Sequence, residues 1–331
     1  MDQVKAGIVS AACRLPLQRR TTRDLFREEG LELSPETATR LGVDQVPLCD
    51  GHQGSELAVA AALEALVRAG VNGSEVDVVV DYTIWPQKWM VPVWNMSGEV
   101  QKAIGAEKAF TVGFSGGGAT NFLAALCYTA AMLEADEKMK YALLVAGDVT
   151  IPGSRVLNPE SPVSVMGDGG SAVLLQRGAA GRVVLGTELL SDGANHDVYY
   201  IPGGCLANPE DPALYRMMLD KSRYDAAPKN ATMLGLAKTV LDRAGVKLAD
   251  VKYVVYPNIS AEDQTAFRDA FGLRSEQLDR SNLSANGHLQ GNDLVLNYIS
   301  LSDNGSLHEG DYILICSHGM GFMAGASLIR I

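Results

Sequence analysis

The sequence predicts an α/β fold made of two similar halves. Amphipathic helical segments alternate with short Val-rich and Leu-rich segments along the whole chain, a pattern typical of layered α/β proteins. Residues 63–80, LEALVRAGVNGSEVDVVV, are matched by residues 238–255, KTVLDRAGVKLADVKYVV. Both stretches predict a helix that stops at Arg-Ala-Gly-Val, then a polar turn, then a strand. A chain of 331 residues has room for two such halves around a shared core.

Three further pairs of segments follow the first pair in the same order. Each half has a glycine-containing turn that leads into an apolar helix, then a hydrophobic strand, then a strand that begins with glycines. These pairs are 111–118 with 286–293, 141–147 with 312–317, and 167–175 with 319–328. Chance seldom repeats four pairs in one order, so the chain predicts an internal duplication with halves 1–180 and 181–331. Residues 191–230 have no counterpart and predict an inserted excursion over one face.

Composition and charge exclude several classes of protein. Hydrophobic residues make up 47% of the chain and charged residues 20%, which indicates a folded globular protein. A net charge of −11 argues against a nucleic-acid partner. No apolar run is long enough to span a membrane, and the N-terminus lacks the pattern of a signal peptide. The scattered cysteines include no Cys-x-x-Cys pair, so neither a disulfide scaffold nor a metal site is indicated. We therefore expect a cytoplasmic protein without a bound metal.

The duplication gives Ser115 and His288 nearly equivalent positions, each in a turn between a strand and a helix. Two halves related by a pseudo-twofold axis bring equivalent positions face to face, so these side chains are expected to meet across the axis. A serine hydroxyl needs a general base within hydrogen-bond reach to act as a nucleophile. His288 is the candidate base. Asp293, five residues later, would orient the imidazole if His288 lies in the turn before the helix begins.

Other interpretations of these residues stay open. Residues 113–117, Gly-Phe-Ser-Gly-Gly, also match the G-x-S-x-G turn of α/β-hydrolases. The half-chain repeat and the lack of an HGGG-type segment argue against that fold. Ser115 could be an inactive relic, His288 a helix cap, and Asp293 a first-turn carboxylate favoured by the helix dipole. His318 is a competing base.

Four segments, spread over the chain in a fixed order, resemble those of a known family. They are Thr39-Arg40-Leu41-Gly42, the turn at 109–118, the strand at 167–175 with its Gly-Asp-Gly start, and the glycine-rich strand pair at 310–325. The family is ketosynthase III (β-ketoacyl-acyl-carrier-protein synthase III), which has the thiolase fold. The resemblance implies two pseudo-symmetric α/β halves in a layered αβαβα core, and a homodimer.

Three positions depart from the family pattern. The resemblance puts Ser115 where the family has a nucleophilic Cys, Asn258 where it has a His, and His288 where it has an Asn. A similar Ser–His–Asp set occurs in acyltransferases and starter-unit enzymes of antibiotic polyketide pathways, and this chain resembles that branch. The resemblance also implies an oxyanion hole made by the backbone N–H groups of Ser115 and Met320.

The resemblance implies a thioester as the acyl donor and no bound cofactor. In the family an early Arg contacts the nucleotide of coenzyme A, beside an aromatic residue that stacks on the adenine. Arg40 is present here, but Glu36 stands where the family has Trp. A thioester of acyl carrier protein is therefore at least as suitable a donor as acyl-coenzyme A.

Together these observations predict an enzyme, an acyltransferase of polyketide-related biosynthesis. It would move an acyl group from a carrier-protein or coenzyme A thioester, through an ester on Ser115, to a small-molecule or carrier-bound acceptor. One alternative is a starter-unit condensing enzyme that joins the acyl group to malonyl-carrier protein by decarboxylative Claisen condensation. Another is a non-catalytic ketosynthase partner. The predicted site comprises Ser115, His288, Asp293, Asn258, Met320 and Arg40.

Overall fold

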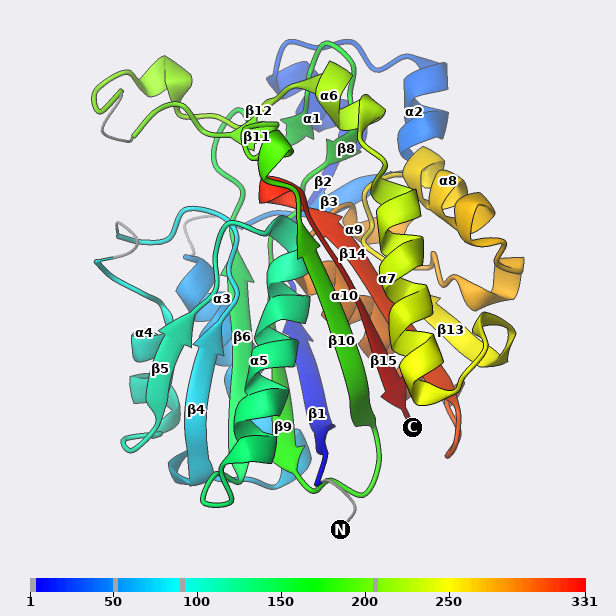
Figure 1. Cartoon of the computed structure of the whole chain (residues 1–331). Helices are drawn as coiled ribbons and strands as arrows, with labels where there is room; N and C mark the ends of the chain where they lie inside the picture. The colour runs from blue at the N-terminus through cyan, green and yellow to red at the C-terminus, as the bar shows by residue number, and fades with distance from the viewer. Residues whose placement is uncertain (1–3, 50–52, 90–92, 205–207) are drawn as a thin grey trace.

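The computed structural model of this chain describes residues 4–49, 53–89, 93–204 and 208–331. Nine strands of this part form one mixed sheet, in the order β13-β14-β15-β10-β1-β9-β6-β4-β5 (Figure 1). They are β1 (Ala6–Arg14), β4 (Val76–Asp81), β5 (Phe110–Gly113), β6 (Tyr141–Asp148), β9 (Gly169–Arg177), β10 (Val183–Ser191), β13 (Val251–Val255), β14 (Tyr312–Gly319) and β15 (Met323–Arg330). The longer helices are α3 (Gly54–Ala69), α4 (Ser97–Ile104), α5 (Asn121–Ala135), α7 (Lys229–Ala244), α8 (Ala261–Phe271) and α10 (Asn292–Asp303).

Shorter elements connect and cover the sheet. Three two-stranded ribbons pair β2 (Arg19–Thr21) with β3 (Gln45–Pro47), β7 (Val156–Leu157) with β8 (Ser164–Val165), and β11 (Tyr199–Tyr200) with β12 (Met218–Leu219). The short helices are α1 (Thr22–Glu28), α2 (Pro35–Leu41), α6 (Lys221–Ala226) and α9 (Leu283–Asn286). Single 3₁₀ turns are η1 (Gly73–Glu75), η2 (Gly118–Thr120), η3 (Gly193–Asn195), η4 (Pro212–Leu214), η5 (Leu248–Asp250), η6 (Ser275–Gln277) and η7 (Met320–Phe322).

The sheet has the same strand order on either side of its centre. From β1 outwards lie β9, β6 and β4, and from β10 outwards lie β15, β14 and β13. In each set the first two pairings are antiparallel and the third is parallel. The residue pair Gly7 with Val183 joins β1 to β10. The predicted segment pairs occupy equivalent places in the two sets, and the predicted division at 180/181 falls in the connection between β9 and β10.

Helices and strands alternate in five layers, which confirms the predicted fold class. Leu126 of α5 and Leu294 of α10 share one buried cluster with Val78 of β4 and Ile313 of β14, so these two helices lie between the two sets of strands. α3 and α4 cover the outer face of the first set, and α7 and α8 cover the second. Because neighbouring strand residues point to opposite faces, Val78 faces the inner cluster and Val79 the outer one. Because helices cover both faces of these strands, their sequences are continuous runs of apolar residues.

The predicted excursion at 191–230 covers the C-terminal end of β14. It contains β11, β12 and α6. The ring of Tyr199 on β11 lies 6.5 Å from that of Phe322 in η7, and the ring of Tyr224 on α6 lies 6.2 Å from that of His318. The excursion thus forms one wall of the region where the two halves meet.

Candidate active site

His288 lies in an irregular turn before α10. Gly287 precedes it with a φ of 60°, and a Cβ atom at Gly287 would lie 2.5 Å from the carbonyl oxygen of Val165. Glycine tolerates both the positive φ and this close approach. The backbone N–H of His288 donates to Val165 O at 2.9 Å, and its carbonyl oxygen accepts from Gly167 N–H at 3.0 Å. These bonds fix the imidazole at the N-terminal end of α10.

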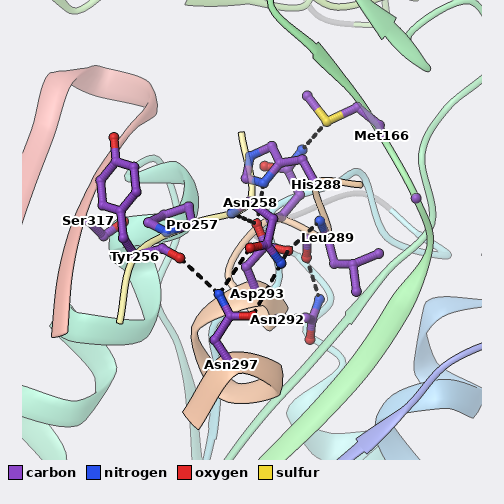
Figure 2. Close-up of polar contacts among 12 residues, drawn as sticks. Met166, Tyr256, Pro257, Asn258, His288, Leu289, Asn292, Asp293, Asn297 and Ser317 are labelled. Carbon is purple, nitrogen blue, oxygen red and sulfur yellow. Dashed lines mark hydrogen bonds and ion pairs between the residues drawn. The ribbon is translucent and has the colours of Figure 1, made fainter. Parts of the chain in front are cut away.

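Asp293 holds the imidazole of His288 from the first turn of α10. Its Oδ2 accepts a hydrogen bond from His288 Nδ1 at 2.5 Å (Figure 2). The side chain of Asp293 is fully buried. Its Oδ1 accepts from the backbone N–H of Leu289 at 2.8 Å. Because Nδ1 donates to the carboxylate, Nε2 is the ring nitrogen left to act as a base. His288 thus lies in the turn before the helix, as its predicted pairing with Asp293 requires. Asp293 also lies in the first turn of α10, as the alternative interpretation of this residue expects.

Asn258 lies behind this pair and is fully buried. Its backbone N–H donates to Asp293 Oδ2 at 2.8 Å. Its side-chain oxygen accepts from Asn297 at 3.1 Å (Figure 2). The same oxygen accepts from Gln264 at 3.2 Å. Asn258 is not among the residues that line the cavity beside His288. The sequence predicts Asn258 as a catalytic residue, whereas the structure gives it the position of a support for the carboxylate of Asp293.

A cavity lies beside His288, and its walls come from both halves of the chain. Its polar side chains are those of Tyr199, His288, Gln290 and His318. The rest of the wall is mostly apolar, with side chains such as those of Leu157, Met166, Met217 and Ile259. Residues of η2 and η7 complete the lining. An apolar cavity with a few convergent polar groups is typical of a small-molecule site.

Gly118 is the residue of the 111–118 segment that reaches this cavity. It opens η2, directly before α5, with a φ of 54°. A Cβ atom built on it would lie 2.5 Å from the backbone nitrogen of Met320 and 3.0 Å from the Cα atom of Gly319. The start of α5 and the C-terminal glycine turn are therefore in direct contact, with no room for a side chain between them. Met320 lines the cavity in which it is predicted to act as an oxyanion donor.

Ser115 does not line the cavity that holds His288. It is exposed in the connection between β5 and η2, and it lines a second hollow together with Trp89 and Tyr215. Glycines at 116, 117 and 118 turn the chain after it, and the last of them occupies the cavity wall. The expected meeting of Ser115 and His288 across the axis is thus not seen in this structure. The roles of Ser115 as nucleophile and oxyanion donor stay predictions.

His318 brings a second imidazole to the cavity, from the C-terminal end of β14. It is buried, and its Nε2 has no hydrogen-bond partner in the part of the chain that the structure describes. Burial, followed by the electrostatic effect of Lys229, lowers the pKa of His318 to about 3. The imidazole is therefore neutral at physiological pH. A neutral imidazole in this place is suited to a hydrogen bond with a ligand.

Two polar residues of the cavity are absent from the predicted site. Gln290 has a φ of 61°, and its Nε2 lies 3.2 Å from the sulfur of Met166. Gln290 could have been predicted as a site residue, because it lies two residues after His288 in the same predicted turn. Tyr199 comes from the excursion, where the sequence shows no repeat to place it. Nothing in the sequence pattern brings it to His288.

Arg40 lies on α2, outside the cavity. Its Nη1 forms an ion pair with Glu262 of α8 at 3.1 Å. Its predicted contact with the acyl donor stays a prediction.

Among the described residues, no thiol lines this cavity and no cluster of metal ligands is present. The free cysteines there are Cys13, Cys49, Cys127 and Cys316; burial raises the pKa of each thiol, and none lines the cavity. Cys205 lies outside the described residues. No group of His, Cys, Asp and Glu among those residues could hold a metal ion.

No helix that the structure describes is long and apolar enough to cross a membrane.

Comparisons with known sequences identify the family. The family model for 3-oxoacyl-[acyl-carrier-protein (ACP)] synthase III matches residues 117–193, and the model for its C-terminal part matches residues 241–331. β-Ketoacyl-[acyl-carrier-protein] synthase III 3 of Streptomyces coelicolor is 30% identical over 290 residues, which cover 85% of this chain and 83% of that protein.

Solved structures share the fold over the whole chain. The priming β-ketosynthase of the R1128 polyketide biosynthetic pathway is 20% identical, with a TM-score of 0.84 over 98% of this chain and 96% of that one. ChlB3, described as an acyltransferase, is 22% identical, with a TM-score of 0.82 over 99% of this chain and 98% of that one. The fold is that of the thiolase-type condensing enzymes. The chain belongs to the ketosynthase III family and is an enzyme of the transferase class.

Proposed function

We propose that this chain transfers the acyl group of a thioester to an acceptor bound beside His288, as a starter-unit enzyme of polyketide-type biosynthesis. The observation that carries the proposal is the buried hydrogen bond between His288 and Asp293 at the wall of an apolar cavity. It supplies a general base beside apolar side chains that an acyl chain would contact. This arrangement also argues against a purely non-catalytic ketosynthase partner.

Condensation with malonyl-carrier protein is the form of this reaction that the relatives favour. The Streptomyces coelicolor relative is named for the synthesis of β-ketoacyl-carrier protein, and the R1128 enzyme for priming a polyketide. In this form the acyl group would be joined to the carbon that malonate exposes when it loses carbon dioxide. The neutral imidazole of His318 would then be a hydrogen-bond partner for the malonyl thioester.

Transfer to an oxygen, nitrogen or thiol acceptor is the second form, and one feature of the site favours it. Asn258 occupies the place where the family pattern has His, and it is bonded to Asp293 and does not line the cavity. His288, tied to a carboxylate through Nδ1, is arranged as a base and not as a neutral donor. A base is what a hydroxyl, amine or thiol acceptor requires. ChlB3 is described as an acyltransferase.

The acyl donor in this proposal is a thioester of acyl carrier protein or coenzyme A, with Arg40 as a contact for its phosphate groups. The Arg40 side chain is partly exposed, in an ion pair with Glu262, whose side chain is 59% exposed. An exposed ion pair of this kind contributes little to stability and can exchange its carboxylate for a phosphate.

Product analysis tests the proposal and separates its two forms. The full chain is incubated with acetyl-, butyryl- and octanoyl-coenzyme A and with the same acyl groups on carrier protein. The acceptor is either malonyl-carrier protein or hydroxylamine. A β-ketoacyl product with stoichiometric release of carbon dioxide establishes condensation, and an acyl hydroxamate formed above the uncatalysed rate establishes heteroatom transfer. Absence of both products with every donor would overturn the proposed function.

A further inference from the structure

The cavity beside His288 is small and is lined by several polar side chains. Its volume is about 30 Å³, which is about the share of one water molecule in the liquid. Besides His288, the side chains of Tyr199, Gln290 and His318 line this space, among mostly apolar neighbours. A polar group enclosed by apolar side chains is unfavourable unless it forms hydrogen bonds. Each of these side chains therefore requires a partner, either in the chain or in a ligand.

His318 has unused hydrogen-bonding capacity at the cavity wall. The residue is 6% exposed, and its Nε2 is buried without a hydrogen bond to any residue that the structure describes. Burial lowers the pKa of the imidazole, which keeps the ring neutral. In a neutral imidazole one ring nitrogen donates and the other accepts. His318 is therefore able to serve as a donor or an acceptor for a ligand.

Gln290 is the second such side chain. It is 2% exposed, and among the described residues the only hydrogen bond of its amide runs from Nε2 to the sulfur of Met166 at 3.2 Å. A thioether is a weak acceptor. The backbone φ of Gln290 is 61°, a value that non-glycine residues seldom adopt and that the surrounding structure has to maintain. The amide is thus held in the cavity wall although the chain gives it no strong partner there.

This inference rests on the proposed function in its second form, transfer to a heteroatom, in which no malonyl thioester occupies His318. We infer that the cavity selects a short acyl group that carries a hydroxyl on its second or third carbon atom. A hydroxyl group both donates and accepts, so it suits the neutral imidazole of His318 together with the amide of Gln290. The apolar side chains of Leu157, Met217 and Ile259 offer contacts to the carbon atoms of the same group.

An acyl group without the hydroxyl would leave these two polar side chains unpaired. A site that hydrogen-bonds a substrate hydroxyl rejects the analogue that lacks it much more strongly than an apolar pocket discriminates against a missing methylene group. The selection acts on the acyl group itself. It therefore applies whether that group is still on its thioester or already on a nucleophile of the enzyme.

Two pairs of donors, whose members differ by a hydroxyl or a methyl group of similar size, test this inference. 2-Hydroxypropionyl-coenzyme A is compared with isobutyryl-coenzyme A, and 3-hydroxybutyryl-coenzyme A with isovaleryl-coenzyme A. Both enantiomers of each hydroxyacyl donor are used. The full chain transfers each acyl group to hydroxylamine, and the hydroxamate is measured above the uncatalysed rate. We expect kcat/KM for the hydroxyacyl donor to exceed that for its methyl counterpart at least about tenfold in one of the pairs.

Variants of the two polar side chains show whether these side chains make the distinction. His318→Phe and Gln290→Leu each remove the hydrogen-bonding groups and keep a side chain of similar size. In each variant the ratio of hydroxyacyl to methyl donor should fall to about one or below. The control is His308→Gln, at an exposed position, which should keep the ratio of the parent. The comparison of donors on the parent chain tests the inference even where a variant does not fold.

The outcomes separate the inference from the proposed function. Hydroxamate formed from both members of each pair with a ratio near one would overturn the inference and leave the proposed function intact. A preference for the hydroxyacyl donors that persists in folded His318→Phe and Gln290→Leu proteins would overturn it as well. So would condensation with malonyl-carrier protein without any hydroxamate. If no donor gives a product with either acceptor, the proposed function itself fails, and the inference fails with it.

Discussion

The imidazole of His288 and the carboxylate of Asp293 are joined by a 2.5 Å hydrogen bond, and the two residues come from different local structures. His288 lies in a turn that Gly287 makes possible, and Asp293 lies in the first turn of α10. Since the carboxylate is also bonded to the backbone N–H groups of Leu289 and Asn258, its position is fixed independently of His288. The pair is therefore preorganised before any substrate binds.

The first prediction concerns the carboxylate. Asp293→Asn removes the charge that stabilises the imidazolium and the acceptor that fixes its tautomer. We expect kcat to fall by about 10²- to 10⁴-fold. The measurement is the steady-state rate of acyl transfer. The matched control is Asp303→Asn, at the exposed C-terminal end of the same helix, which should leave kcat unchanged. A loss of less than tenfold in a folded Asp293→Asn protein would contradict this role.

The second prediction concerns the size of the acyl chain. Met217 is buried and lines the cavity, so Met217→Ala makes room for further methylene groups. We expect the ratio of kcat/KM for octanoyl over acetyl donors to rise at least about tenfold. The control is Met139→Ala, which truncates a partly buried methionine of the inner cluster outside the cavity. An unchanged ratio would show that the acyl chain binds elsewhere.

The third prediction concerns the acid stability of the fold. Burial lowers the pKa of His318 to about 3, whereas an unfolded histidine has a pKa near 6.5. Between these values the unfolded state binds more protons, so this residue lowers the stability of the native state as pH falls below about 6.5. The loss approaches about 1.4 kcal/mol per pH unit.

Urea unfolding at a series of pH values measures this effect. The His318→Phe variant should lose less stability than the parent between pH 6 and pH 4.5, by about 2 kcal/mol. Burial raises the pKa of Asp148 to about 7 and that of Asp263 to about 6, which acts in the opposite direction. Both carboxyls are present in parent and variant, so the difference isolates His318. Parallel stability curves would show that His318 is not held neutral.

The fourth prediction concerns the homodimer that the family resemblance implies. β5 ends the sheet and pairs only with β4 in the described part of the chain, and Phe110 on it is 63% exposed. An exposed sheet edge with an apolar residue is a ready surface for a second copy. We expect a dimer by light scattering, and a monomer for Phe110→Asp. The control Leu17→Asp, at a position that is 98% exposed, should remain dimeric. A monomeric parent chain would refute the dimer.

The half-chain repeat made most of the fold predictable. The match between 63–80 and 238–255 fixes α3–β4 and α7–β13, and the glycine turns lead into the central helices. The pairing of His288 with Asp293 was also predictable, because it is local in sequence. The place of Ser115 was not, because positive φ values at Gly116 and Gly118 redirect the chain by a route that residue spacing does not encode. Tyr199 was missed because the excursion that carries it has no repeat partner.

The central claim is that His288 acts as the base for acyl transfer in this cavity. The most direct test is the rate of butyryl transfer to hydroxylamine by His288→Gln, measured beside the parent chain and a His308→Gln control on the exposed surface. The account predicts that His288→Gln loses at least about 10³-fold in kcat with an unchanged thermal midpoint, while His308→Gln retains full activity. Activity of a folded His288→Gln protein within tenfold of the parent would contradict it.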